Sequence, residues 1–514
     1  MKKRNENRQL FINIITNVVS YSSFLIVSFI LTPYLINTLG KEAYSFFPLA
    51  NNFVNYMMIL SNALATVASR YMTVTLTNKE YDNANKYFNS ILFSDIIISG
   101  ILLIPIVIII VFIDVFLNVP INLVATVRVL FSLTFASMLV TILTSAFDVA
   151  TFVRNRLDLR SVKDLASNIL RPVLFYVFFA FFEPTIVYVG VVTMITAVVN
   201  FGFQYGYTKM LLPEIRINIK KFDWKYVKEV IVSAVWNSLN SLGNMLLVST
   251  TLLLINILYG ADSGGEYAIV QTIPNFVNGV ISTLTGVFYP LIMLKYAQKD
   301  IQGLVSEIKK SQCIVGLFSV SVIGVFIGLS KPFFDLWTPG QNSEQLVILS
   351  TITIIPHCII SCIWVLNNVI VAINKMRVPA FYLLGSGVVN IIVSVVACKL
   401  FDCGMVVVPL VSTLLQIIWV GVFMPVYVSK KLNLKWTTFY SGIVRGVIGC
   451  LLAWTIATAA NSLFVPDSWV KLIGVGMCAG IIVLAINSVV ILNKESRHYI
   501  ICRFREKLGY KVKQ

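Results

Sequence analysis

Residues 96–113 read Ile-Ile-Ile-Ser-Gly-Ile-Leu-Leu-Ile-Pro-Ile-Val-Ile-Ile-Ile-Val-Phe-Ile, with no charged side chain between Asp95 and Asp114. A helix needs roughly 20 apolar residues, each rising about 1.5 Å, to cross the hydrocarbon core of a bilayer. In lipid the backbone must satisfy its own polar groups, so such a stretch is helical. Outward from this stretch, the same criterion predicts an all-α polytopic membrane protein with fourteen transmembrane helices. They lie at 10–37, 43–72, 88–117, 121–152, 162–182, 185–207, 229–258, 265–294, 312–336, 344–373, 378–398, 404–428, 439–462 and 468–492.

The basic residues fall on one side of these spans. Of the 40 Lys and Arg, 34 lie in the two tails and in or beside alternate gaps. The six exceptions are Lys41, Arg128, Arg171, Lys331, Lys399 and Lys471. Short loops rich in Lys and Arg stay in the cytoplasm, so both termini are predicted to be cytoplasmic. The net charge of +17 then reflects topology and attraction to anionic lipids, and it requires no nucleic-acid partner.

The composition excludes several classes of protein. Hydrophobic residues make up 57% of the chain and charged residues 12%, and the mean hydropathy of +0.84 is outside the soluble range. The eight Cys show no metal-ligand spacing and only two His are present, so no metal or cofactor is expected. No gap is large enough for a folded domain, and the carboxylates of the outer gaps lie in short turns without a catalytic partner. We therefore expect no enzymatic activity.

Two short patterns recur in the two halves of the chain. Leu-Ile-Asn-Thr-Leu at 35–39 and Asn-Asn-Phe-Val-Asn at 51–55 correspond to Leu-Ile-Asn-Ile-Leu at 254–258 and Pro-Asn-Phe-Val-Asn at 274–278. They predict parallel repeats of six spans, an arrangement typical of transporters with a substrate path at the repeat interface. The predicted parts are an N-terminal six-helix lobe, a basic cytoplasmic linker along the membrane surface, a C-terminal six-helix lobe, and helices 13 and 14 with a basic cytoplasmic tail. Their bounds are 1–207, 208–228, 229–430 and 431–514.

Several short motifs occur in a defined order. Leu39-Gly40-Lys41-Glu42-Ala43-Tyr44 follows the first span, and the stretch from Asn62 to Arg70 ends the second in an arginine. Arg156-Leu157-Asp158, Gly265-Glu266-Tyr267 and Phe288-Tyr289-Pro290-Leu291-Ile292 follow further along. In order and spacing they resemble the Wzx-type flippases, the polysaccharide branch of the multidrug/oligosaccharidyl-lipid/polysaccharide (MOP) exporter superfamily. Ala63 stands where that family usually has glycine.

The resemblance implies a transporter that moves undecaprenyl-pyrophosphate-linked oligosaccharide repeat units across the bacterial cytoplasmic membrane by alternating access. It also implies two pseudo-symmetric six-helix bundles around a central cavity, as in MATE transporters, with helices 13 and 14 as additions. The carried units would enter the assembly of capsule, O-antigen lipopolysaccharide or exopolysaccharide. Membrane lipids, a polysaccharide polymerase and chain-length machinery are then the expected partners.

Polar side chains form stripes on three of the predicted helices. Asn51, Asn55, Asn62, Thr66 and Arg70 fall within about 100° of arc on the second span. Similar stripes on the seventh and eighth spans comprise Asn237, Asn240, Ser241 and Asn244, and Gln271, Asn275 and Asn278. Polar stripes facing lipid are costly, so they are expected either to line a cavity or to make interhelical hydrogen bonds.

Charges within the membrane are a sharper signal. Arg171 lies about nine residues into the fifth span, roughly 13 Å along the helix. Given the resemblance, Arg171 and Arg70 are predicted to bind a diphosphate, which arginine recognises in bidentate fashion. The alternative is snorkelling, or pairing with Asp95 or Asp148, which are also candidates for ion coupling. For Arg128 both interpretations stay open, and snorkelling is favoured for Lys295.

Two other functions are alternatives. A cation-coupled multidrug exporter on the same fold usually carries a buried acid in its first or seventh helix. The apolar cores of the first and seventh spans contain no Asp or Glu, and the few deep charges are mostly basic. A membrane polymerase or ligase that acts on lipid-linked sugars is disfavoured by the short outer loops. The flippase is therefore the preferred hypothesis.

Overall fold

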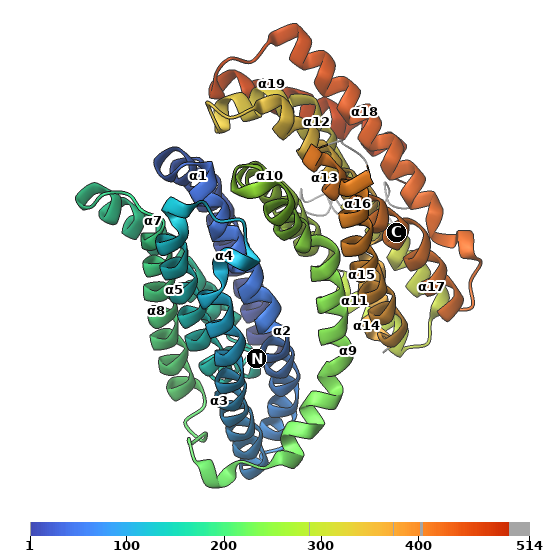
Figure 1. Ribbon diagram of the computed structural model, residues 1–514. Helices are drawn as coiled ribbons and strands as arrows, with labels where there is room; N and C mark the ends of the chain where they lie inside the picture. Colours follow the sequence, from blue (N-terminus) through green and yellow to red (C-terminus); the bar gives the residue numbers. More distant parts are fainter. Residues whose placement is uncertain (1, 287, 374, 401–403, 493–514) are drawn as a thin grey trace. The chain divides into compact units, whose positions relative to one another are not determined.

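The computed structural model describes residues 2–286, 288–373, 375–400 and 404–492, and over these ranges its regular structure is entirely helical (Figure 1). The basic tail predicted beyond helix 14 lies outside the described residues. The first helices are α1 (Lys2–Leu39), α2 (Lys41–Thr77), α3 (Tyr81–Val111), α4 (Ile113–Phe116), η1 (Ile121–Leu123), α5 (Val124–Leu143), α6 (Ser145–Val153), α7 (Leu157–Phe181), α8 (Val187–Leu211) and η2 (Ile219–Lys221). The next are α9 (Trp224–Val248), α10 (Thr250–Gly286), α11 (Tyr289–Ala297), α12 (Ile301–Trp337), α13 (Ser343–Ile363) and α14 (Val365–Ala372). The last are α15 (Arg377–Leu400), η3 (Gly404–Val406), α16 (Val407–Ile418), η4 (Trp419–Phe423), α17 (Met424–Lys431), η5 (Trp436–Phe439), α18 (Tyr440–Phe464) and α19 (Trp469–Val490).

The helices agree with the predicted membrane spans. Among the described residues, 12 apolar segments are long enough to cross a membrane. One of them, Ala234–Gly286, has 53 residues and would extend about 80 Å if straight, more than twice the hydrocarbon thickness. It is broken at Gly260, whose φ of 88° suits glycine and ends a helix, so it contains two spans. With α2, whose 37 residues include the polar stripe, the described chain accommodates the fourteen predicted spans.

Several of the predicted spans are discontinuous. The third comprises α3 and α4, the seventh is divided at Ser249 between α9 and α10, and the eighth comprises the end of α10 and α11. The fourth is divided at Thr144 into α5 and α6, and the tenth at Trp364 into α13 and α14. The twelfth comprises α16 and α17 with the π-helical turn η4 between them. Such interruptions within a membrane are tolerated where protein or water satisfies the freed backbone groups. They are not evident from hydropathy, because the stretches that contain them are apolar enough on average to continue a span.

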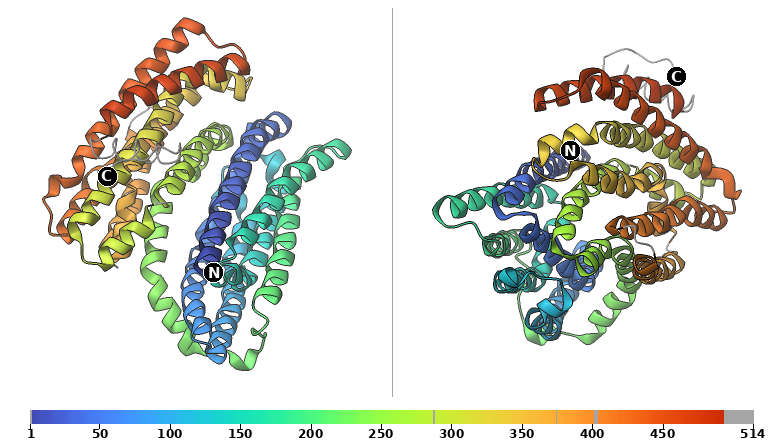
Figure 2. Two further views of the ribbon diagram at one scale, coloured as in Figure 1. Left: turned by 180° about the vertical axis from the view of Figure 1, so that it is seen from behind. Right: turned by 45° about the horizontal axis from the view of Figure 1, so that its top comes forward.

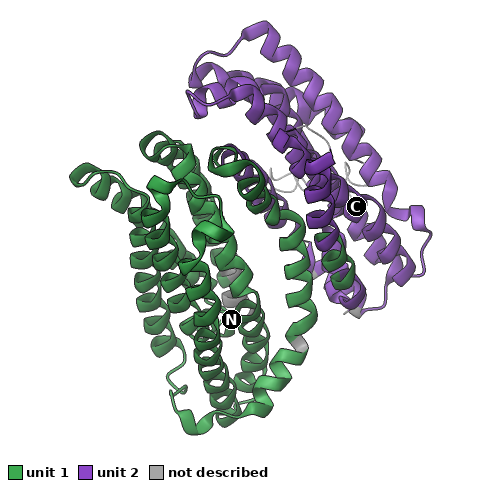
Figure 3. Cartoon of the chain, viewed as in Figure 1, with its two compact units in different colours: residues 1–265, 380–387 green, residues 266–379, 388–514 purple. Residues whose placement is uncertain are grey.

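The chain forms two compact units, residues 1–265 with 380–387 and residues 266–379 with 388–514 (Figure 3). In the first unit α1 packs on α7, α5 packs on α8, and α2 contacts α3, α5, α6 and α9 (Figures 1 and 2). Ala68, Met72, Phe88 and Phe147 belong to the buried core that joins α2, α3 and α6. The unit extends beyond the linker because α9 packs against α2 and α3. The division of the chain into four parts, with bounds after residues 207, 228 and 430, stays a prediction.

In the second unit, the two helices beyond the predicted repeats are closely packed. α18 lies along α12, and α19 contacts both of them (Figure 2). Small residues face one another in this contact, with Gly324 against Ala453 and Gly328 against Ala457. Small side chains allow helix backbones to approach closely in a membrane, where van der Waals contact drives association. The predicted thirteenth and fourteenth spans, α18 and α19, are thus an integral part of the second unit.

The linker after α8 is fixed on α3. Asn85 Nδ2 donates to the Glu214 carbonyl (3.0 Å) and Asn85 Oδ1 accepts from the Arg216 amide (2.8 Å). One turn later, Asn89 Nδ2 donates to the Arg216 carbonyl (2.8 Å) and Asn89 Oδ1 accepts from the Asn218 amide (2.7 Å). Two side-chain amides thus hold the linker backbone in place. Its predicted position along the membrane surface stays a prediction.

Candidate functional site

The polar stripe of α2 is open rather than packed. Asn62, Thr66 and Arg70 are exposed, and no other described helix makes a hydrogen bond to their side chains. Two residues nearer the start of α2, at the edge of the same arc, do make such bonds: Asn52 donates to the Ser249 carbonyl (3.3 Å), and the Tyr56 hydroxyl lies 3.1 Å from Thr250 Oγ1. The polar side of α2 is therefore used in packing around these two residues and is accessible further along the helix, from Asn62 to Arg70. The sequence pattern did not single out Tyr56.

The stripes on α9 and α10 are also accessible. Asn237 and Asn244 are exposed on α9, and Asn240 is half-buried between them. On α10, in the second unit, Asn275 is exposed and Gln271 is half-buried. Among the described residues none makes a hydrogen bond to these five side-chain amides. An exposed amide within a membrane span is unfavourable against lipid, so these side chains favour contact with water or a polar ligand.

Arg171 is the intramembrane charge without a nearby counter-ion. It lies on α7 and is partly buried, and no described residue is within hydrogen-bond or ion-pair distance of its guanidinium. The carboxylate of Asp164 acts on it only through space. Arg70 likewise has no such partner among the described residues. A guanidinium in a membrane span favours an anionic partner, which for these two residues must come from outside the described chain.

Two other predicted cations are paired within the protein. Arg128 donates to Asp114 Oδ1 (2.8 Å) and to the Val111 carbonyl (3.1 Å). Lys295 forms an ion pair with Asp300 (2.8 Å) beyond the end of its span. These contacts support a structural role for both side chains. They also separate Arg128, for which the sequence left both interpretations open, from Arg171.

The two acidic candidates have different surroundings. Asp148 on α6 pairs with Lys163 Nζ of α7 (3.1 Å), and Arg160 (3.5 Å) and Gln204 (3.4 Å) also approach it. Asp95 on α3 has no exposed surface, and the hydrogen-bond donors to its carboxylate among the described residues are both serines. Neither acid pairs with Arg70 or Arg171, which was the alternative for these arginines.

Lys163 is a buried residue near the site that the sequence pattern did not single out. Its cluster of basic neighbours is explained by the positive-inside rule, whereas in the structure its side chain is buried, with 6% exposed. Lys163, Ser167 and Arg171 recur every fourth residue along α7 and share one broad face. Ser167 Oγ donates to Asn200 Oδ1 of α8 (2.7 Å). The i, i+4, i+8 spacing was the available signal for this polar track.

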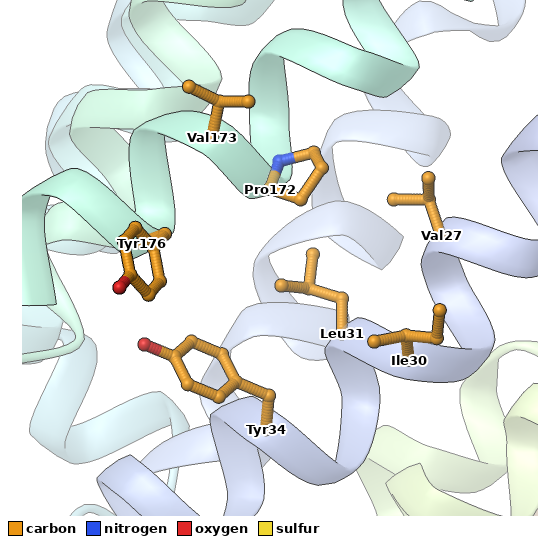
Figure 4. A pocket seen from close by; sticks show the side chains of 7 residues that line it. All are labelled: Val27, Ile30, Leu31, Tyr34, Pro172, Val173 and Tyr176. Carbon is orange, nitrogen blue, oxygen red and sulfur yellow. The ribbon is translucent and has the colours of Figure 1, made fainter.

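An apolar pocket of about 460 Å³ lies between α1 and α7 (Figure 4). This volume is in the range of small-molecule sites, roughly 300–1,000 Å³. Figure 4 shows the hydroxyls of Tyr34 and Tyr176 turned toward each other at one end. Pro172 lines the pocket and directly follows Arg171, whose side chain projects about 100° further round the helix. The other lining residues are Val27, Ile30, Leu31 and Val173.

Comparison with known proteins identifies the fold. No family model matches the chain. It is 27% identical over 499 residues to a Bacillus subtilis (strain 168) protein described as "Uncharacterized membrane protein EpsK", covering 97% of this chain and 98% of that one. An inward-facing multidrug resistance MATE family transporter of the MOP superfamily superposes with a TM-score of 0.68 at 11% identity, over 81% of this chain and 98% of that chain. The lipid II flippase MurJ in an inward closed conformation gives 0.63 at 14% identity, over 96% and 99%.

The chain thus has the fold of MOP-superfamily transporters. The predicted all-helical, MATE-like fold class is confirmed, and so is a protein with many membrane spans. The superposed proteins are described as a transporter and a flippase, and the expectation of no enzymatic activity stays a prediction. The cytoplasmic position of the termini stays a prediction.

Proposed function

We propose that the protein is a Wzx-type flippase that moves undecaprenyl-pyrophosphate-linked oligosaccharide units across the bacterial cytoplasmic membrane by alternating access. The units would serve capsule, O-antigen or exopolysaccharide assembly, with membrane lipids as surroundings and a polymerase and chain-length machinery as later partners. The observation that carries the proposal is Arg171, a guanidinium within a membrane span with no anionic partner among the described residues. A fold shared with a lipid II flippase supports it.

The chemistry around Arg171 suits a lipid diphosphate. Its planar guanidinium can bind two phosphate oxygens at once, which lysine cannot reproduce. The pocket that begins at Pro172 is lined by apolar side chains and two tyrosine rings, which suits part of a long isoprenoid chain. The two features lie on adjacent faces of α7, as a substrate with an anionic headgroup and an apolar tail requires.

The open polar stripes suit the glycan. Side-chain amides both donate and accept hydrogen bonds, so they can bind sugar hydroxyls of many arrangements. Asn62, Asn237, Asn244 and Asn275 are exposed amides that we assign to this role. Arg70, at the predicted cytoplasmic end of the α2 stripe, is assigned to contact the diphosphate as it enters.

The second candidate is a cation-coupled multidrug exporter, favoured by the superposition on a MATE transporter. Asp95 is a buried acid of the kind such exporters use, but it lies on α3. An unpaired Arg171 would repel a cationic drug. A polymerase or ligase is the least favoured of the three, since the connections between spans are short.

The test uses a strain that lacks the protein and is supplied with variants on a plasmid. We expect the empty strain and Arg171→Ala to accumulate lipid-linked repeat units on the cytoplasmic side, and the wild type to restore export. Loss of charge-assisted hydrogen bonds costs about 1.5–3 kcal/mol, or roughly 10- to 100-fold in substrate affinity. Arg171→Lys should recover only part of this loss.

The matched control is Arg160→Ala, because Arg160 is an exposed arginine on the same helix with only a loose contact to Asp148 (3.5 Å). It should export normally at equal membrane abundance. Normal polymer assembly in the empty strain would refute the proposed function. Resistance to cationic drugs that depends on the protein would favour the exporter instead.

A further inference from the structure

Asp95 lies in an enclosed polar site where three helices meet. Its carboxylate, on α3, is fully buried. Asp95 Oδ1 accepts a hydrogen bond from Ser61 Oγ of α2 (3.2 Å), and Oδ2 accepts a short one from Ser145 Oγ of α6. Ser145 is the first residue of α6, directly after the break at Thr144 that divides the fourth span. One acid thus connects two continuous helices to the start of a discontinuous one.

No described basic group neutralises this acid. The charged groups on the elements that pack against α3 all lie beyond hydrogen-bond and ion-pair distance of Asp95 in the described chain. They are Lys41, Glu42 and Arg70 on α2, Asp114 on α4, Arg128 on α5, Asp148 on α6, Lys220 and Lys221 on η2, and Lys225, Lys228 and Glu229 on α9. A buried carboxylate that has only hydroxyl partners is strongly unfavourable when ionised. Asp95 therefore requires a bound cation, either a proton or a metal ion.

We propose that Asp95 is a proton-binding site of the transport cycle. The site offers four side-chain oxygen atoms, two from the carboxylate and two from Ser61 and Ser145, whereas Ca²⁺ and Mg²⁺ take about six or more oxygen ligands. A proton needs only one of them. The reaction is a simple ionisation, in which the carboxyl O–H bond breaks to give a carboxylate and a proton that passes to water. The proposal concerns the energy source of transport and does not depend on which substrate is carried.

The bonding of the serines depends on this proton. An ionised Asp95 accepts from both hydroxyls, as the structure has it. A protonated carboxyl group must donate one hydrogen bond, so one serine has to turn and accept. Binding or release of the proton therefore reverses the direction of one hydrogen bond that α3 makes with α2 or with α6.

Residues assigned to bind the substrate lie near both serines along the chain. Ser61 directly precedes Asn62 in the open stripe of α2. On α6, Asp148 lies one turn after Ser145 and pairs with Lys163, two turns before Arg171 on α7. The proton site and these groups lie in one compact unit, and they are linked by the backbones of α2, α6 and α7 and by the Asp148–Lys163 pair. We assign the two possible directions of the serine hydrogen bonds as the two-state element that such coupling needs.

The direct test is an infrared titration of the purified full-length protein in lipid nanodiscs. We expect the wild type to show a protonated-carboxyl band that disappears as the pH rises and is absent in Asp95→Asn. Asp148→Asn is the control, because that acid is paired with Lys163 and should leave the band in place. Titration with sodium chloride at fixed pH should leave it unchanged. A wild type without the band, or a band displaced by sodium, would overturn the proton assignment.

A second measurement tests the link to α2. The labelling rate of Asn62→Cys by a water-soluble maleimide is compared at one pH with and without Asp95→Asn. We expect a change of severalfold at this position and none at Thr77→Cys, near the end of the same helix. Equal rates at position 62 in both backgrounds would show that α2 does not respond to the proton. Neither measurement uses a substrate, so a negative result in them would not refute the proposed flippase function. A negative result in the export test would likewise not refute the proton site.

Discussion

Replacement of Gly324 by alanine tests whether α18 and α19, the predicted thirteenth and fourteenth spans, belong to the folded unit. A Cβ atom added at Gly324 of α12 would lie 2.4 Å from the Ala453 Cβ and 2.7 Å from the Cys450 carbonyl oxygen of α18. Ordinary contact begins at 3.4 Å. The helices would therefore have to separate locally by about 1 Å, because backbone and Cβ atoms cannot turn away as a long side chain can.

The size of the effect follows from two opposing contributions. Overpacking of a close contact costs about 1–3 kcal/mol. Alanine in place of glycine in a helix gains about 0.5–1 kcal/mol. The net destabilisation by Gly324→Ala should thus lie between about 0 and 2.5 kcal/mol. Gly480 on α19 is the matched control, because an added Cβ there meets no atom within 4 Å, so Gly480→Ala should be stabilised by the helical gain alone.

The assay is reversible unfolding of the full chain in mixed micelles, with the difference in unfolding free energy between the two variants as the readout. That difference isolates the strain, about 1–3 kcal/mol, since the helical gain cancels. Ala453→Gly in the Gly324→Ala background should recover only part of it, because the Cys450 carbonyl contact remains. Equal stability of Gly324→Ala and Gly480→Ala would refute close packing of α18 on α12.

Three further predictions concern polar contacts. Lys163→Met should destabilise the first unit by about 3 kcal/mol, since Asp148 loses its closest cation, and adding Asp148→Asn should restore most of it in the same unfolding assay. Asn89→Ala removes two hydrogen bonds to the linker backbone, about 2 kcal/mol locally, and faster hydrogen exchange confined to the linker would bear this out. The Lys295 ammonium holds the pKa of Asp300 below its usual range. The ion pair should therefore stabilise the start of α12 at every pH above the ordinary pKa of aspartate. This stabilisation should be lost as the pH falls through the lowered pKa of Asp300, and hydrogen exchange at the start of α12 should then become faster. An exchange rate that stays the same over this pH range would contradict the prediction.

The membrane spans and their number could be predicted because each span is a property of its own segment. Hydropathy over residues 96–113 is sufficient to place that helix in lipid, whatever surrounds it. The breaks at Thr144 and Trp364 could not be predicted in this way. A break depends on which neighbours satisfy the freed backbone groups, and those neighbours come from distant parts of the chain.

The candidate site was predictable in residue type but not in pairing. Arg128 and Arg171 look alike in sequence, yet Asp114 neutralises the first and no described acid neutralises the second. Asn52 and Asn62 lie on the same helix, and only the placement of Ser249 makes one a packing residue while the other stays open.

Hydropathy is sufficient to predict a helical protein of fourteen spans and its orientation, because transfer from water to lipid acts on each segment separately. Which charges within those spans have no partner in the described chain depends on the tertiary structure. Hydrogen bonds and ion pairs act over a few ångströms, so they depend on how distant segments come together. That is why Arg171 can be recognised from the sequence as a charge within a span, whereas its lack of a described partner and the two serine partners of Asp95 required the fold.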